Sequence, residues 1–288
     1  MRIRILHETC YRYGAPARAL QQILRLTPRD HDGQHALRWR IEPSAEGRLV
    51  ADIDHFGNAV HTFSADEELR ELTLRVDGEI ETTDTAGMIR DPIERVADAC
   101  FLRDTDLTVA DDAIRAFAKH VSGRPGDTLA TLHRLLVAVN ETVRFDVNPT
   151  DSGTRAAEAF ALKRGVCQDL THIFLAAARH LDIPSRYVSG YFLRADGVIE
   201  QEAGHAWAEA KVADLGWIGF DPANGISVTE AHLRMAIGLD YLGAAPVRGS
   251  RRGGGSESLE VRIRVELAAP NTQSQSQQRA LPSSPPHS

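Results

Sequence analysis

Lysine is almost missing from this chain of 288 residues: only Lys119, Lys163 and Lys211 occur, and arginine supplies the other basic side chains. The 33 basic side chains are outnumbered by 40 acidic ones, which gives a formal net charge of -7. A nucleic-acid surface needs clustered positive charge. We therefore expect no nucleic-acid partner, and we draw no function from the preference for arginine.

Long apolar runs are also missing. The amino terminus, MRIRILHETCYRY, alternates charged and apolar residues and lacks the apolar run of a signal peptide. No stretch approaches the roughly 18 apolar residues that a membrane helix needs. We expect a cytoplasmic protein without a membrane partner. Its 42% hydrophobic and 25% charged residues are typical of a globular protein with sizeable cores, and its length suits about two domains.

Cysteine is scarce too, and Cys10, Cys100 and Cys167 are widely separated. Three such residues cannot form a disulfide framework and show no paired spacing for zinc. The consecutive glycines at 253–255 are not followed by a phosphate-binding motif. We expect no cofactor, no metal and free thiols, one of which could be reactive.

The first 83 residues alternate apolar and polar side chains with a period of two, which predicts strands of a β-rich amino-terminal domain. Ile3 and Ile5 open this pattern. It returns at residues 37–41 and 72–76. Gly57–Asn58 and Asp77–Gly78 have the chemistry of turns.

From about residue 91 the period becomes helical, which indicates a second domain over residues 84–268. Helices are predicted from Pro92, across residues 114–121, and across residues 129–143 behind Asp127 as N-cap. Residues 258–267 alternate again and should join a sheet. We expect a flexible loop at 248–258 and a disordered tail at 269–288, which is polar and rich in proline.

Cys167 lies where a loop turns into an apolar helix. Gly165 allows a tight turn just before it, and Pro184 stops the helix after an apolar stripe. Unpaired N–H groups and the helix dipole at such a position stabilise a thiolate, the nucleophilic form of cysteine. The alternative is a small buried core residue, which most free cysteines are. Asp169 is interpreted as a first-turn carboxylate that complements the dipole and does not help the thiolate.

A hairpin predicted at residues 205–221 supplies a candidate base. His205 alternates with alanines in GHAWAEAKV, and WIGFD returns after a turn. A turn centred near residue 213 pairs His205 with Asp221, so that imidazole and carboxylate face each other on one side of the sheet. An ordinary hairpin with a surface histidine is the alternative. Trp207 and Trp217 are interpreted as core residues rather than as walls of an amine tunnel.

A mononuclear metal site of Cys167, His172, His205 and Asp221 is a rival arrangement. His172 follows Cys167 by five residues, about 140° around a helix, so the two should not share a ligand face. We therefore favour a nucleophile with its base and orienting carboxylate.

These motifs resemble those of the bacterial transglutaminase-like proteins, which have a papain-like cysteine fold. The similar segments are GVCQDL at 165–170, IPSRYVSGY at 183–191, GHAWAEA at 204–210 and GWIGFDPANG at 216–225. The opening HETCYRYGAP and RLTPR resemble the β-rich amino-terminal domain of that family. The resemblance covers roughly residues 1–267. One departure is Leu239, in GLDY, where such proteins commonly have arginine.

The resemblance implies that Cys167 is the nucleophile, His205 the base and Asp221 the orienting residue. It also implies an α+β protein in which the Cys167 helix packs on an antiparallel sheet of a papain-like transglutaminase core. The implied activity is acyl transfer on an amide of a peptide or protein through a thioester. Hydrolysis is favoured, and the alternatives are γ-glutamyl transfer to an amine and a binding module without turnover. The sequence does not fix the oligomeric state.

Overall fold

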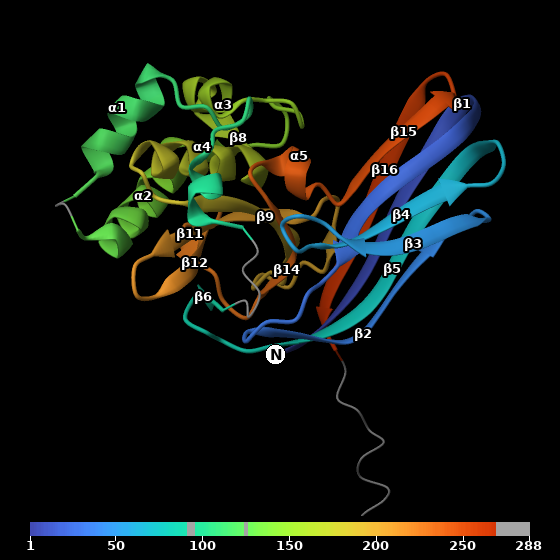
Figure 1. Ribbon diagram of the computed structural model, residues 1–288, viewed down its shortest axis with the longest axis horizontal. Helices are drawn as coiled ribbons and strands as arrows, with labels where there is room; N and C mark the ends of the chain where they lie inside the picture. The colour runs from blue at the N-terminus through green and yellow to red at the C-terminus, as the bar shows by residue number, and fades with distance from the viewer. Residues whose placement is uncertain (91–95, 124–125, 269–288) are drawn as a thin grey trace, which may run out of the picture.

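The computed structural model describes residues 1–90, 96–123 and 126–268. Two bodies lie side by side: a sheet of very long strands and a smaller sheet covered by helices (Figure 1). The helical elements are η1 (Asp98–Leu102), α1 (Asp112–Val121), α2 (Thr128–Thr142), α3 (Ala156–Leu162), α4 (Cys167–His180) and α5 (Tyr241–Ala244). Strands predominate over helices in the described residues.

The larger sheet is built around β1 (Arg2–Thr27). The order β10-β16-β1-β4-β3 forms its main path, β15 and β5 also pair with β1, and β2 pairs with β5. The partner strands are β2 (Gln34–Pro43), β3 (Gly47–Ile53), β4 (Ala59–Ala65), β5 (Leu69–Thr82), β10 (Glu200–Gln201), β15 (Val247–Gly253) and β16 (Glu257–Leu267). The β-rich amino-terminal region predicted from the period-two pattern is thus confirmed, and residues 258–267 join its sheet.

One of the two predicted turns is wrong. Gly57 has a left-handed φ of 81° and follows a turn, as expected. Gly78 instead lies within β5, opposite Ile5 of β1 and Trp39 of β2. A Cβ atom on Gly78 would come within 2.0 Å of the Trp39 ring. The glycine therefore provides room for an indole that packs flat on the strand.

The predicted loop at 248–258 is also wrong in large part. β15 pairs antiparallel with β1, from Ala17 opposite Gly253 to Leu24 opposite Val247. Its side chains are mostly exposed, so the segment lacks the alternation that identifies a strand. Backbone pairing with β1 orders it, and the glycines at 253–255, all with positive φ, form the turn into β16.

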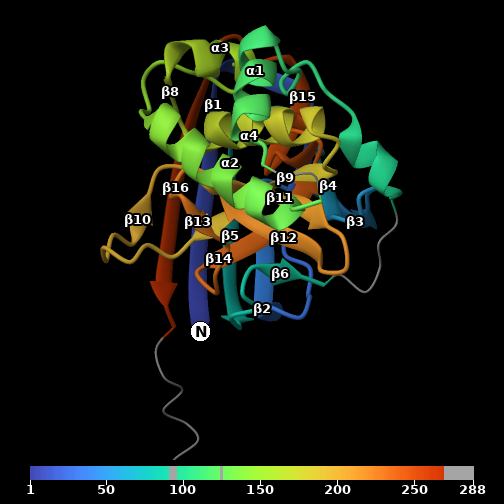
Figure 2. The ribbon, with the colours of Figure 1, turned by 90° about the vertical axis from the view of Figure 1, so that its left-hand side faces the viewer.

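The smaller sheet has the order β13-β12-β11-β9-β14, with β6 paired to β12. Its strands are β6 (Met88–Ile89), β9 (Ser185–Phe192), β11 (His205–Val212), β12 (Gly216–Asp221), β13 (Ile226–Ser227) and β14 (His232–Gly238). α1, α2, α3 and α4 stack over one face of it (Figure 2). A separate parallel pair is formed by β7 (Arg144–Phe145) and β8 (Arg164–Gly165).

The helices follow the predicted periods. α1 and α2 cover the two predicted apolar stripes, and the Asp127 carboxylate accepts a hydrogen bond from Ala130 N. α4 is buried on nearly all sides between the sheet and the other helices. Of the helix predicted from Pro92, the start lies outside the described residues, and the described part contains the short 3₁₀ helix η1.

The two bodies share a core and a strand edge. Ile3, Ile5 and Val265 of the larger sheet pack against Leu233 and Met235 of β14. Two amide side chains bind the same strand. Gln34 contacts Arg234 N and O at 2.8 and 2.9 Å, and Asn58 contacts Ile237 N and O at 2.8 Å each. The larger sheet therefore supports β14 through apolar packing and four hydrogen bonds.

In the described part of the chain, each helix is too short or too polar to span a lipid bilayer. The tail predicted at 269–288 lies outside the described residues.

Candidate active site

Cys167 is the first residue of α4, as the sequence predicts, and it is partly buried. The Asp169 carboxylate accepts hydrogen bonds from Val166 N at 2.8 Å and from the Thr150 hydroxyl at 2.7 Å. This carboxylate closes the first turn, and burial raises its pKa. A Cβ atom on Gly165 would lie 2.6 Å from Asp169 Oδ2, so the glycine permits this turn to form directly before Cys167.

His205 and Asp221 come together, although the predicted register is wrong by two. His205 Nε2 lies 2.6 Å from Asp221 Oδ2. The β11–β12 ladder pairs Val212 with Gly216 and Ala208 with Phe220, so partner numbers sum to 428 rather than to the expected 426. The turn has three residues, 213–215, and Asp214 takes a left-handed φ of 64°. Because side chains alternate with a period of two, a shift of two leaves both residues on the same face.

The Asp221 carboxylate is fully buried and accepts hydrogen bonds from five groups. Oδ1 accepts from the backbone N–H groups of Ala223 and Asn224 at 3.0 and 3.1 Å. Oδ2 lies close to His205 Nε2, to Asn224 Nδ2 at 2.7 Å and to His232 Nε2 at 3.1 Å. This network fixes the carboxylate toward both imidazole rings.

Sequence reasoning missed His232. It opens β14, a strand that the period-two pattern alone did not identify, and lies opposite Phe192 at the end of β9, with its Nε2 3.1 Å from Asp221 Oδ2. Sequence reasoning also missed the role of Asn224, whose side chain donates a hydrogen bond to Asp221. The sequence HLRMAIG is the signal that could have located His232, since it follows Asp221 closely and is apolar and β-prone.

The pKa values of His205 and His232 shift in opposite directions. Burial acts to lower the pKa of His205, but hydrogen bonds to Asp221 and Cys167 outweigh it and raise that pKa to about 10. Burial also lowers the pKa of His232, and this effect exceeds that of its bond to Asp221. The same two histidines hold the pKa of Asp221 far below its usual value despite its burial. The arrangement favours a charged His205, an ionised Asp221 and a neutral His232.

The four residues of the rival metal set, Cys167, His172, His205 and Asp221, do not bring their ligand atoms together as one group in the described part of the chain. His172 is fully buried, and its Nε2 accepts a hydrogen bond from Tyr241 N at 3.1 Å. Among the described residues, the group with ligand atoms within 4.8 Å of one another is His205, Asp221 and His232, which includes neither His172 nor Cys167. In that group the nitrogens and the carboxylate oxygen already pair with one another by hydrogen bonds.

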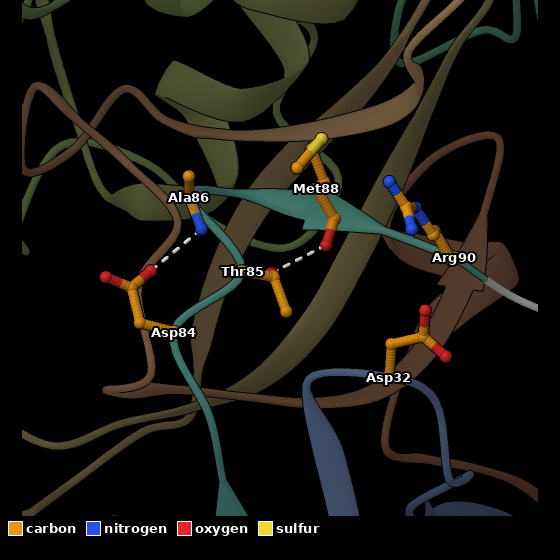
Figure 3. Close-up of a pocket in the computed structure, with 6 residues that line it drawn as sticks. All are labelled: Asp32, Asp84, Thr85, Ala86, Met88 and Arg90. Atoms are coloured by element: carbon orange, nitrogen blue, oxygen red, sulfur yellow. Dashed lines mark hydrogen bonds between the residues drawn. The ribbon is translucent and has the colours of Figure 1, made fainter.

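A pocket of about 380 Å³ lies elsewhere, between the loop after β1 and the segment around β6 (Figure 3). Its described lining residues are Asp32, Asp84, Thr85, Ala86, Met88 and Arg90. Thr85 and Asp84 use their side chains to stabilise the local turn, at 2.6 Å to Met88 O and 2.8 Å to Ala86 N. The pocket includes none of Cys167, His205 and Asp221 and is distinct from the candidate active site.

Leu239 packs beside Ile89, Phe101 and Trp217 in a small apolar cluster. Its carbonyl accepts a hydrogen bond from Arg179 at 2.7 Å. At the position where proteins of the resembling family commonly have arginine, this chain therefore has a leucine in apolar contacts.

Comparisons with known proteins agree with these motifs. The pattern of the transglutaminase-like superfamily matches residues 115–222, and that of the bacterial transglutaminase-like N-terminal region matches residues 3–81. An uncharacterized protein of Mycobacterium leprae is 30% identical over 284 residues, covering 93% of this chain and 99% of the relative. An uncharacterized protein of Mycobacterium tuberculosis is 27% identical over 275 residues, covering 86% of this chain and 87% of the relative.

Among solved structures, a candidate cysteine protease from Cytophaga hutchinsonii matches with a TM-score of 0.75 at 18% identity, covering 94% of this chain and 92% of that chain. At this identity the likeness shows a shared fold. The two matching sequence patterns, the near full-length relative and the fold lead to one conclusion: the chain belongs to the bacterial transglutaminase-like proteins of the transglutaminase-like superfamily.

Proposed function

We propose that this protein is a cysteine acyl-transfer enzyme in which Cys167 is the nucleophile, His205 the base and Asp221 the orienting residue. The observation that supports it most is the 2.6 Å contact between His205 Nε2 and buried Asp221, with His205 also hydrogen-bonded to Cys167. The Asp221 carboxylate accepts a hydrogen bond from His205 Nε2–H, which leaves Nδ1 as the nitrogen for the thiol. This is the constellation of an oriented imidazole beside an activated thiol.

The proposed reaction begins with the Cys167 proton held on His205 Nδ1, and the resulting thiolate attacks an amide carbonyl. The C–N bond breaks, His205 donates its Nδ1 proton to the leaving amine, and an acyl thioester remains on Cys167. A second nucleophile then gives its proton to His205 as it attacks the thioester, and the thiol is regenerated. Asp221 stabilises the imidazolium each time His205 becomes protonated. The backbone N–H of Cys167, at the start of α4, is the candidate donor to the oxyanion.

In this proposal the smaller sheet and α4 form a papain-like core with the nucleophile at the helix head. The substrate class is an amide of a peptide or protein, without cofactor or metal. We further propose a cytoplasmic protein that has no nucleic-acid or membrane partner.

We favour water as the acceptor. An amine acceptor needs a site that excludes water from the thioester. Trp207 and Trp217, the tryptophans closest in sequence to His205 and Asp221, are 1% and 4% exposed. They pack into apolar clusters, as the sequence suggests, so they are poor walls for an amine tunnel. The alternatives are γ-glutamyl transfer to an amine and a binding module that keeps the fold.

The test supplies a glutamine-containing peptide and a labelled primary amine at millimolar concentration and follows both products by mass spectrometry. We expect free acid in excess of amine adduct, loss of both products in Cys167→Ala, and normal rates in the matched control Cys100→Ala. Amine adduct in excess would make the enzyme a transferase. Neither product across a broad peptide panel, with Cys167 reactive, would favour the binding module.

A further inference from the structure

His232 has a buried position at the start of β14, among residues of the smaller sheet. Its side chain is 0% exposed and faces Asp221 directly. Its ring contacts those of Phe192 and Trp207, with centroids 4.6 and 5.3 Å away, and lies 6.1 Å from that of His205. β14, which carries it, is supported by the larger sheet through Gln34 and Asn58. A side chain so enclosed has one orientation.

The hydrogen bonds of His232 fix the position of its ring proton. Thr229 N lies 3.1 Å from Nδ1. A backbone N–H can only donate, so Nδ1 accepts and carries no proton. The proton of the neutral ring is therefore on Nε2, which donates to Asp221 Oδ2 at 3.1 Å. Burial keeps the ring neutral by lowering its pKa.

Asp221 can support His205 only if one oxygen faces the imidazole. Oδ1 is held by the backbone of the turn after β12, whereas Oδ2 is shared by His205, Asn224 and His232. Asn224 is exposed and lies in the turn directly after β12, three residues from Asp221. His232 belongs to β14, a separate strand that is buried. His232 is thus the buried hydrogen-bond donor that holds Asp221 Oδ2 in position.

We infer that His232 is a positioning residue for the reaction: through its Nε2–H it fixes Asp221 Oδ2 toward His205 and thereby orients the base. This inference rests on the proposed function of Cys167, His205 and Asp221. Because His232 is neutral, it adds a donor without adding a second positive charge that would weaken the His205–Asp221 pair. The larger sheet contributes to the site indirectly, through β14.

Two substitutions separate this role from a purely structural one. His232→Gln places an amide nitrogen near the position of Nε2 and can still donate to Asp221, but loses the contact with Thr229. His232→Asn places its oxygen near Nδ1 and can still accept from Thr229 N, but no longer reaches Asp221. His7→Gln is the matched control, because His7 is buried and hydrogen-bonded to Tyr191 at 2.7 Å outside the candidate site.

The measurement is the rate constant for alkylation of Cys167 by iodoacetamide in the full chain, together with kcat and KM for any peptide that turns over. We expect His232→Asn to lower the rate constant and kcat by about 10–100-fold with KM little changed. His232→Gln should stay within about fivefold of wild type, as a retained donor preserves most of the orientation. His7→Gln should match wild type.

Equal rates in His232→Asn and wild type, while His205→Gln slows alkylation, would overturn the role of His232 and leave the proposed function standing. If His205→Gln has no effect either, the proposed function itself fails. Should His232→Asn not fold, ¹⁵N NMR of the wild-type imidazole rings decides. A protonated Nε2 with a bare Nδ1 in His232 supports the inference, and a protonated Nδ1 at neutral pH overturns it.

Discussion

Asp221 is buried more deeply than its place at a strand end suggests. A carboxylate at a strand end is usually exposed, but the Asp221 side chain is fully buried and hydrogen-bonded to five groups. Its removal therefore affects stability as well as chemistry, because the buried donors around it lose their acceptor. Asp221→Asn is a better probe than Asp221→Ala, since it keeps the volume.

Asp221→Asn should lower turnover by about 10²–10⁴-fold, because an amide nitrogen facing His205 forces the wrong tautomer and removes the charge that stabilises imidazolium. We expect a smaller loss than in Cys167→Ala. Turnover is measured beside thermal unfolding, so that only folded protein is compared. Full activity in a folded variant would mean that another residue orients His205.

His205 also predicts a pH dependence of stability. Its pKa rises from the usual 6.5 to about 10 on folding. A raised pKa means that the folded state holds the proton more tightly, so the stabilisation is complete below pH 6.5 and is lost as the pH rises through about 10. The free energy of unfolding of wild type, minus that of His205→Gln, should therefore fall across this window. A flat difference in urea titrations over the same range would contradict the raised pKa.

At the scale of the element, the hairpin shows how far sequence reasoning reaches. Alternation placed His205 and Asp221 on facing strands, and their contact follows because the register error of two keeps them on one face. The turn length depends on backbone angles at Asp214 and Gly216 that the sequence does not state. His232 could not be paired with Asp221 from the local pattern, because β9 and β11 stand between β14 and β12, the strand that ends at Asp221.

The edge of β14 is held by side-chain amides rather than by another strand, and Asn58 tests this feature. Asn58→Ala leaves Ile237 N and O without their partner. We expect a loss of about 2–4 kcal/mol in the free energy of unfolding, from two buried backbone groups left unpaired. Asn148→Ala is the control, since that side chain bonds only the exposed turn at Asp146. Equal losses in the free energy of unfolding for Asn58→Ala and Asn148→Ala, measured by urea titration, would mean that the Asn58 hydrogen bonds to β14 do not stabilise the protein.

At the scale of the whole molecule, the last described strand, β16, pairs with the first, β1. β16 pairs with β1 from Ile3 opposite Leu267 to Tyr13 opposite Glu257, so the larger sheet joins both ends of the described chain. The sequence predicts that residues 258–267 join a sheet, but alternation alone cannot say which one. The choice is made by the shared core, where Ile263 and Val265 pack with Ile3 and Ile5.

Because β1 pairs with β16, we predict that residues 1–83 do not fold alone. The fragment lacks β15 and β16 as well as the cover that Leu233 and Met235 give to Ile3 and Ile5. Burial of those side chains is worth about 1.5–3 kcal/mol each, which a domain of this size can hardly lose. We expect no cooperative thermal transition by circular dichroism for the fragment, and a clear one for residues 1–268. A cooperative transition in the fragment would show that the larger sheet is an independent domain.

The central claim is that Cys167 forms the acyl-enzyme. Cys10, Cys100 and Cys167 are all partly exposed, so access alone does not distinguish them. The most direct measurement mixes the full chain with p-nitrophenyl acetate, records the release of p-nitrophenolate, and locates the acetyl group by peptide mapping. We predict a rapid burst close to one equivalent per chain, acetyl on Cys167, the same burst in Cys100→Ala and none in Cys167→Ala. A burst that persists in Cys167→Ala, or acetyl found first on Cys10 or Cys100, would contradict the assignment of the nucleophile.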